Sequence, residues 1–177
     1  MPVPRIILAL IGVNPFPELE GLKQHLSRVF NDAQLSVNLL PGSLLEIAFS
    51  PRRRQYNSTK LLIKLAETSQ EFQADRVLGI VDVDLYAGGL NFVFGEAQFP
   101  GKFAVISLYR LKPKYYGETD GNLFLSRIRK EAVHELGHTF GLAHCPDSKC
   151  VMHFSNSIYD TDFKMDVFCM RCNEKLS

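Results

Sequence analysis

Residues 134–144 read His-Glu-Leu-Gly-His-Thr-Phe-Gly-Leu-Ala-His, and the chemistry of the chain is concentrated in this stretch. Two histidines four positions apart lie one above the other on a helix, so His134 and His138 can bind the same metal ion. Glu135 stands beside the first histidine, close enough to a metal-bound water to take its proton. The first five residues therefore predict a metal-binding helix that carries its own general base.

The second half of the stretch predicts a third ligand. Gly141 falls where such a helix should stop, and a glycine can adopt the left-handed turn that would bring His144 back to the metal. Three neutral imidazoles that leave a fourth position for water are typical of catalytic zinc, since a structural site is closed by protein ligands. The alternative is a helix whose histidines cover its surface or are hydrogen-bonded in the core. The glycine and third histidine at these offsets favour the zinc site.

The histidine spacing is that of the metzincin metallopeptidases, whose motif is followed by a methionine turn. Here Cys150-Val151-Met152-His153 stands in that place. The pattern Cys-x4-Cys-x-Met follows the third histidine directly, and Cys169-x2-Cys172 comes later. Together these resemble the archaemetzincins, a branch of the clan in which four cysteines hold a second, structural zinc. Weaker similarities to that family lie at residues 51–56 and 91–97.

The resemblance implies a zinc-dependent peptidase with two zinc ions in each chain, one catalytic and one structural. The structural ion would be held by Cys145, Cys150, Cys169 and Cys172. Spacings of two to four residues and a reducing compartment favour thiolate ligands, whereas two disulfides, in any of three pairings, or free thiols are the alternatives. Met152 is expected beneath the histidines as a hydrophobic floor, because a thioether is a poor zinc ligand beside imidazoles.

Hydrophobic periodicity predicts an α/β fold with a mixed twisted sheet, an antiparallel edge strand and helices on the faces. The resemblance implies the same architecture, since metzincins are similarly built. The zinc helix should begin between Asp120 and Ser126. Four charged residues are expected on its solvent-exposed side or in the segment that leads into it: Arg127, Arg129, Lys130 and Glu131. We expect one catalytic domain over residues 1–177, with an upper part (1–141) and a lower part (142–177) that carries the methionine turn and the cysteines. The strands are expected at 5–13, 34–40, 76–85, 91–98 and 103–109, and the earlier helices at 19–30 and 58–72.

The segment 91–98 is short, set off by Gly88-Gly89 and Pro100-Gly101, and is predicted to be the edge strand. An exposed edge must be covered, charged or used. The resemblance implies a use, because in the related metzincins the corresponding edge lies above the zinc and pairs with the peptide. We therefore expect an extended peptide to pair with this edge and a substrate pocket to form beside residues 154–157, just after the methionine turn. The alternative is an idle edge that its glycine and glutamate protect. The predicted substrate-binding residues are Phe94, Gly95, Glu96 and Ala97.

Composition limits the remaining possibilities. The chain has 177 residues and a net charge of +1, which gives no electrostatic reason to expect nucleic acid as a partner. No apolar run reaches the roughly 20 residues of a membrane span, and residues 6–13 lack the flanks of a signal peptide. We therefore expect a cytoplasmic monomer whose partner is a peptide or protein substrate. Two other classes of function are possible. One is a zinc-stabilised interaction module without turnover, which Glu135 disfavours because such a module needs no general base. The other is a hydrolase of non-peptide amides or esters.

Three features stay open at this level. A tyrosine could stabilise the oxyanion, but no spacing selects one among Tyr109, Tyr115, Tyr116 and Tyr159. Asp82 and Asp84 more often end a strand or anchor a loop than bind a cation without a third oxygen ligand nearby. The run of arginines at residues 52–54 is most simply a solvated face, and the roles of Gln55 and Tyr56 do not follow from the sequence.

Overall fold

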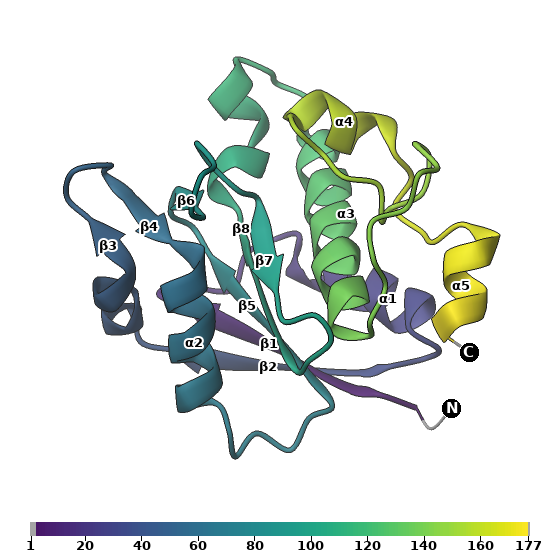
Figure 1. Cartoon of the computed structure of the whole chain (residues 1–177), viewed down its shortest axis with the longest axis horizontal. Coiled ribbons are helices and arrows are strands. Elements are labelled where there is room, and N and C mark those ends of the chain that lie inside the picture. The colour runs from purple at the N-terminus through teal and green to yellow at the C-terminus, as the bar shows by residue number, and fades with distance from the viewer. Residues whose placement is uncertain (1–2, 177) are drawn as a thin grey trace.

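A five-stranded sheet forms the centre of the molecule, with strand order β2-β1-β5-β8-β7 (Figure 1). The computed structural model describes residues 3–176. Strands β2, β1, β5 and β8 are parallel, and β7 pairs antiparallel with β8 at the edge. The predicted fold class, a mixed α/β sheet with an antiparallel edge strand, is confirmed. The strands are β1 (Arg5–Ile11), β2 (Gln34–Leu40), β5 (Arg76–Val81), β7 (Gly95–Ala97) and β8 (Phe103–Ser107).

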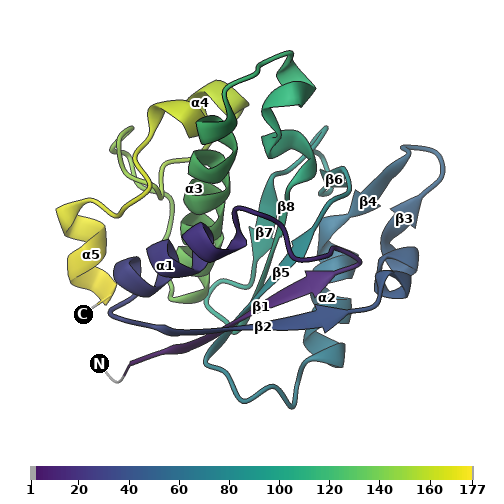
Figure 2. The ribbon, with the colours of Figure 1, turned by 180° about the vertical axis from the view of Figure 1, so that it is seen from behind.

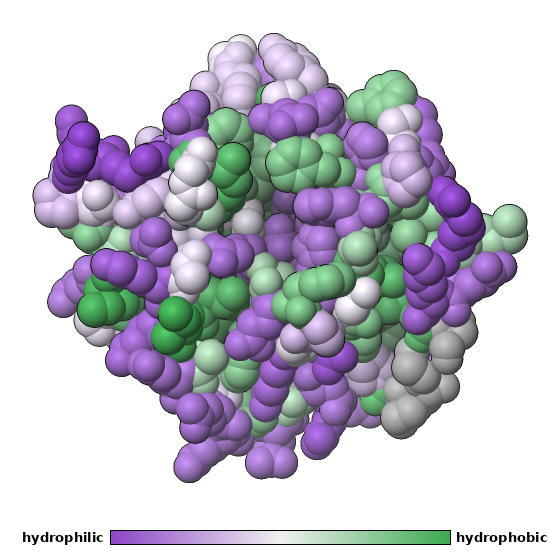
Figure 3. All heavy atoms as spheres, viewed as in Figure 1, coloured by the Kyte–Doolittle hydropathy of each residue, from purple (hydrophilic) through white to green (hydrophobic). Residues whose placement is uncertain are grey.

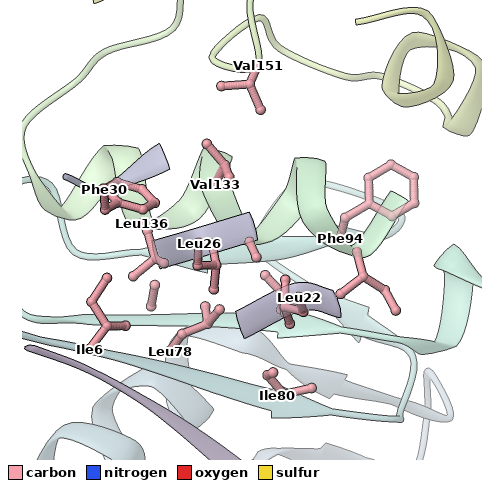
Figure 4. Close-up of a cluster of buried hydrophobic side chains, with 14 of the residues drawn as sticks. Ile6, Leu22, Leu26, Phe30, Leu78, Ile80, Phe94, Val133, Leu136 and Val151 are labelled. Atoms are coloured by element: carbon pink, nitrogen blue, oxygen red, sulfur yellow. The ribbon is translucent and has the colours of Figure 1, made fainter. Parts of the chain in front are cut away.

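Helices cover both faces of this sheet (Figures 1 and 2). Helix α2 (Ser58–Thr68) packs on one face, and α1 (Leu19–Val29) and α3 (Gly121–Thr139) pack on the other. A parallel sheet buried on both sides needs strands that are apolar at nearly every position, and β1 and β8 have such sequences. Figure 4 shows the larger of the two cores, with side chains of α1, α3 and the sheet gathered in one cluster: Leu22, Leu26, Leu136, Ile6 and Leu78.

Several element boundaries differ from the predicted ones. The strand expected at 76–85 ends at Val81, because Leu85–Tyr86 leaves the main sheet as β6 and pairs with β4. The edge strand is only three residues long, since Val93 donates its amide to Leu85 instead of to β8. The small second sheet has the order β3-β4-β6, and it consists of β3 (Phe49–Ser50), β4 (Gln55–Asn57) and β6 (Leu85–Tyr86) beside the 3₁₀ helix η1 (Gly42–Ala48).

Side chains from the small sheet hold the loop that leads into the edge strand. Gln55 is buried and donates to the carboxylate of Asp84 and to the carbonyl oxygen of Asn91. Arg53 donates to the same carbonyl oxygen and to that of Leu90, so one of the three arginines is not simply solvated. Asp84 accepts two hydrogen bonds from Arg110, at 2.6 and 2.8 Å, and therefore anchors a loop. Asp82 forms an ion pair with Lys112.

The chain after α3 folds back along the outer side of that helix (Figure 1). This part contains α4 (Ile158–Phe163) and α5 (Met170–Leu176) and, among its described residues, no strand. Between β8 and α3 lie two short 3₁₀ helices, η2 (Tyr109–Leu111) and η3 (Pro113–Tyr116). No helix within residues 3–176 has the length and apolar character needed to cross a membrane.

The solvent exposure predicted for four charged residues of α3 is wrong for three of them. Arg127, Lys130 and Glu131 are buried, and only Arg129 is partly exposed. The cause is α4, whose Asp162 accepts hydrogen bonds from Arg127 through its side chain and from Lys130 through its backbone carbonyl. These charges are buried because the C-terminal part supplies their partners. They hold that part of the chain against α3.

Candidate metal centre and cleft

Helix α3 and the turn after it gather the three predicted histidines. The side chain of Asp120 accepts from the amide of Asn122 and caps the start of the helix. The helix ends at Thr139, and Gly141 follows with a left-handed φ of 89° that turns the chain toward the histidines again. The ring of His144 consequently lies 5.4 Å from that of His134 and 4.9 Å from that of His138, centroid to centroid.

The positions of the ring nitrogens fit a zinc ion. One ligand atom from each of the three histidines lies within 4.8 Å of the others, and the Nε2 atoms of His134 and His138 are 3.1 Å apart. Zn–N bonds of about 2.0–2.1 Å in a tetrahedron place nitrogens about 3.3 Å apart. On the opposite side of each ring, Nδ1 of His134 lies 2.8 Å from the carbonyl oxygen of Val151, and Nδ1 of His138 lies 2.7 Å from that of Leu142. Donation from Nδ1 leaves Nε2 free for a metal.

The surroundings of these histidines favour their neutral form. Burial lowers the pKa of His134 well below its ordinary value, and the neighbouring ammonium group of Lys164 lowers it further. The pKa values of His138 and His144 are lowered in the same direction, again mainly because burial disfavours the charged ring. A metal ligand must offer a free lone pair, so neutral imidazoles match this role.

Glu135 points into the same space from the adjacent position of the helix. Its side chain is buried, and burial raises its pKa well above the ordinary value; the carboxylate of Glu131 adds to this shift and Lys164 opposes it. Gly95 of the edge strand lies directly against this side chain. The Val105 carbonyl oxygen lies on the same side of Gly95, so both a backbone atom and the Glu135 side chain approach this glycine closely.

The four cysteines form a second cluster beside the first. All are free thiols, and their sulfur atoms lie within 4.8 Å of one another. The sulfurs of Cys145 and Cys169 are 3.8 Å apart, which matches the spacing of about 3.8 Å in a tetrahedron of Zn–S bonds near 2.3 Å. It is far longer than a disulfide bond of about 2.05 Å. The backbone amide of Cys172 lowers the pKa of Cys169 to about 7, so this thiol is readily ionised.

Met152 and the turn around it connect the two clusters. Met152 is fully buried and packs under α3, where a side chain at Gly137 would come within 2.5 Å of its sulfur. The amide of Cys145 donates to the carbonyl oxygen of Met152 at 3.0 Å, and Nδ1 of His153 lies 2.8 Å from the carbonyl oxygen of Cys145. The methionine turn therefore supports the segment that carries both His144 and the first cysteine.

A cleft of about 610 Å³ runs between the edge strand and the segment after the methionine turn. Figure 3 shows the hollow near the centre of the face seen in Figure 1. One wall is the edge strand, and the opposite wall includes three residues of the predicted pocket: Phe154, Ser155 and Asn156. The cleft gathers the predicted site residues His134, Glu135, His138, His144, Phe94, Gly95, Glu96 and Ala97.

Two features of the cleft do not follow from the sequence. Lys164 lines it with a buried side chain, whose Nζ lies 3.5 Å from a carboxylate oxygen of Glu131 and 3.3 Å from the carbonyl oxygen of His153. Nothing in the sequence near Lys164 signals this position. Glu96 does not face the open edge: its carboxylate accepts hydrogen bonds from Ser58 and Thr59 at the start of α2. The four candidate tyrosines are absent from the described lining of the cleft.

Comparisons with known proteins agree with this geometry. The family model of peptidase family M54 matches residues 19–177. An archaemetzincin of Pyrococcus abyssi is 46% identical over 175 residues, which are 97% of this chain and 93% of the relative. The crystal structure of archaemetzincin from Methanopyrus kandleri superposes with a TM-score of 0.85 at 40% identity, covering 98% of this chain and 93% of that one.

A second crystal structure, archaemetzincin from Archaeoglobus fulgidus complexed with malonate, superposes with a TM-score of 0.80 at 38% identity and covers 97% of this chain and 99% of the other. The matches extend over nearly the whole length of each relative, so they apply to the full fold and not to a shared motif alone. The chain belongs to peptidase family M54, the archaemetzincins, and is a zinc metallopeptidase that acts on peptides or proteins.

Proposed function

We propose that His134, His138 and His144 hold the catalytic zinc and that Glu135 is the general base for hydrolysis of a peptide bond. The observation that carries this proposal is the convergence of three neutral ring nitrogens and one buried carboxyl group at the floor of a single cleft. When bound, zinc supplies Lewis acidity that activates a water molecule and polarises the scissile carbonyl group.

The environment of Glu135 suits both proton transfers of the reaction. As a carboxylate it accepts the proton of the attacking water. Its burial then favours the protonated form, so that Glu135 holds the proton until the leaving amine takes it. Donation from Nδ1 of His134 and His138 to backbone carbonyls fixes the ring orientations during these steps.

A second zinc ion is proposed for the four cysteines. Their 3.8 Å sulfur spacing and the absence of any disulfide among the described residues support a closed thiolate site. Such a site contributes folding energy and needs no open position for water. We therefore assign it a structural role, and the expected total is two zinc ions for each chain.

The proposed substrate is an extended peptide that pairs with β7. Phe94 accepts a hydrogen bond from the amide of Ser107, and Gln98 donates to the carbonyl oxygen of Phe103, so alternate residues of this segment are bonded to β8. By the same alternation, the backbone amide and carbonyl groups of Gly95 and Ala97 point toward the open edge. This arrangement supports binding by strand addition, with affinity from main-chain hydrogen bonds and little demand on sequence.

The test is turnover of a mixed peptide library by zinc-loaded Glu135→Gln protein. Turnover should fall about 10²-fold or more while zinc content and melting temperature stay close to wild type. The matched control is Glu131→Gln, which makes the same change at a buried carboxylate one turn earlier on α3 and should lose far less turnover. Near-wild-type hydrolysis by Glu135→Gln, or equal losses in both variants, would contradict the assignment.

A further inference from the structure

Gly95 of the edge strand lies directly against the side chain of Glu135 on the zinc helix. A Cβ atom built on Gly95 would lie 2.7 Å from Cγ and 3.0 Å from Cδ of Glu135. Carbon atoms without a bond between them prefer about 3.5–4.0 Å. The backbone at Gly95 does not have a positive φ, so its dihedral angles do not require glycine. The space taken up by the Glu135 side chain and by the Val105 carbonyl oxygen does.

The edge strand cannot easily move away from this contact. On the side covered by α2, the Glu96 carboxylate is held by the hydroxyl groups of Ser58 and Thr59, the latter at 2.9 and 3.0 Å. At its end the side-chain oxygen of Gln98 accepts from the amides of Lys102 and Phe103 and closes the turn to β8. A Cβ on residue 95 would also lie 2.6 Å from the Val105 carbonyl oxygen, which blocks a shift toward β8.

The helix is equally restricted. Val133 and Leu136 of α3 are fully buried in the larger core. The turn between β7 and β8 is joined to the end of the helix, because the amide of Gly101 donates to the carbonyl oxygen of Thr139 at 3.0 Å. Because these contacts hold both the edge strand and α3 in place, an added methyl group at position 95 would displace the most mobile part of the contact. That part is the carboxyl end of Glu135.

We propose that Gly95 is a positioning residue for the general base: its missing side chain creates the space that fixes the Glu135 carboxyl group. This inference rests on the proposed function, in which Glu135 takes and returns the proton. Restoring a contact of about 3.6 Å from 2.7 Å requires a displacement of about 0.9 Å. A misplacement of about 1 Å at a reacting group can cost about 10²-fold in rate.

The same residue thereby joins two parts of the mechanism. The backbone amide and carbonyl groups of Gly95 face the open edge where a peptide would pair, and the Glu135 side chain packs against the Cα atom of Gly95. A peptide aligned by Gly95 is consequently aligned with the general base as well. Gly95 thus sets the distance between the bound main chain and the group that delivers the proton.

The first experiment is Gly95→Ala, assayed for kcat, KM and zinc content. The expected result is a fall in kcat of about 10²-fold with KM within about threefold of wild type and unchanged zinc. The matched control is Gly79→Ala in β5, where the new Cβ would meet the end of the Leu65 side chain at 2.8 Å and no catalytic group. Gly79→Ala should keep wild-type kcat. Wild-type kcat in zinc-loaded Gly95→Ala would overturn the proposal.

Thermal melting gives a readout that is independent of activity. Glu135→Ala removes the Cγ and Cδ atoms that a side chain at position 95 would meet. The drop in melting temperature caused by Gly95→Ala should therefore be smaller in the Glu135→Ala protein than in the wild-type protein. If Gly95→Ala alone does not fold, recovery of folding by Glu135→Ala supports the proposal. Equal losses in both backgrounds, or no folding in either, would overturn it. If Glu135→Gln is inactive but Gly95→Ala is active, this inference fails alone; active Glu135→Gln refutes the proposed function itself.

Discussion

Arg127→Met should be the most damaging single change far from the cleft. Arg127 is fully buried in α3 and donates to both carboxylate oxygens of Asp162, at 2.8 and 2.7 Å, and to Glu118 at 2.7 Å. Its hydrogen bonds with Asp162 raise the pKa of Arg127 above the ordinary value despite burial, so the guanidinium group stays charged. Methionine would fill most of the volume but would leave both acids without their cation.

The magnitude follows from the burial of Arg127 and of its two acidic partners. Removing one member of a buried ion pair typically costs about 3–5 kcal/mol. Here the side chains of Asp162 and Glu118 are 26% and 32% exposed and can regain some water. The lower end of that range is therefore expected, about 3 kcal/mol of the free energy of unfolding. In a chain of this length that corresponds to a drop in melting temperature of roughly 6–12 °C.

The assay is urea unfolding of the zinc-loaded protein, with Arg129→Met as the matched control. Arg129 is two residues along the same helix, and its hydrogen bond to the Gly21 carbonyl oxygen is a weak 3.4 Å. Its loss should cost less than about 1 kcal/mol. Asp162→Asn added to Arg127→Met should recover part of the stability, because it removes an unpaired charge. Equal losses for the two arginine variants would refute the role of Arg127 as the fastening between α3 and α4.

The remaining predictions concern metal and substrate. Mild chelation should remove about one zinc ion and abolish turnover with little change in the melting curve, because the three-histidine site is open. Cys169→Ser or Cys172→Ser should instead lower the melting temperature. Wild-type melting and two bound zinc ions in both cysteine variants would show that the cysteine cluster is wrongly assigned. Peptides N-methylated at alternate positions should lose turnover by about tenfold or more where the missing donor faces Gly95 or Ala97, since each main-chain bond contributes about 1 kcal/mol and the methyl group adds a clash. Equal hydrolysis of all N-methylated isomers would exclude strand addition. Gly95→Pro cannot replace this test, because any side chain at that position also meets Glu135.

The sequence predicts the elements whose causes are local. A buried run of isoleucine and leucine specifies β1, and Asp120 begins the zinc helix within the predicted window. The left-handed turn at Gly141 also follows from a single residue type at a helix end. The spacing of the histidines and of the cysteines brings the proposed ligands together, because those within each short segment share a helix or a turn. These parts of the fold and site are set over a few residues each.

Other features depend on partners far along the chain. Glu131 reads as a solvated helix residue, and its burial depends on Lys164, 33 positions later (164 − 131). The contact between Gly95 and Glu135 arises because an element 40 positions later (135 − 95) packs against the edge strand. The strand expected at 76–85 is divided because Leu85 finds a partner in β4. No local pattern contains such information, since it arises from the packing of elements that the sequence separates.

The most direct test of the account is the location of zinc in crystals of the protein, measured by anomalous diffraction on both sides of the zinc absorption edge. The account predicts two peaks for each chain. One should lie within about 2.1 Å of nitrogens of His134, His138 and His144, and the other about 2.3 Å from the sulfurs of the four cysteines. A single peak, or a first site that lacks one of the three histidines, would contradict it.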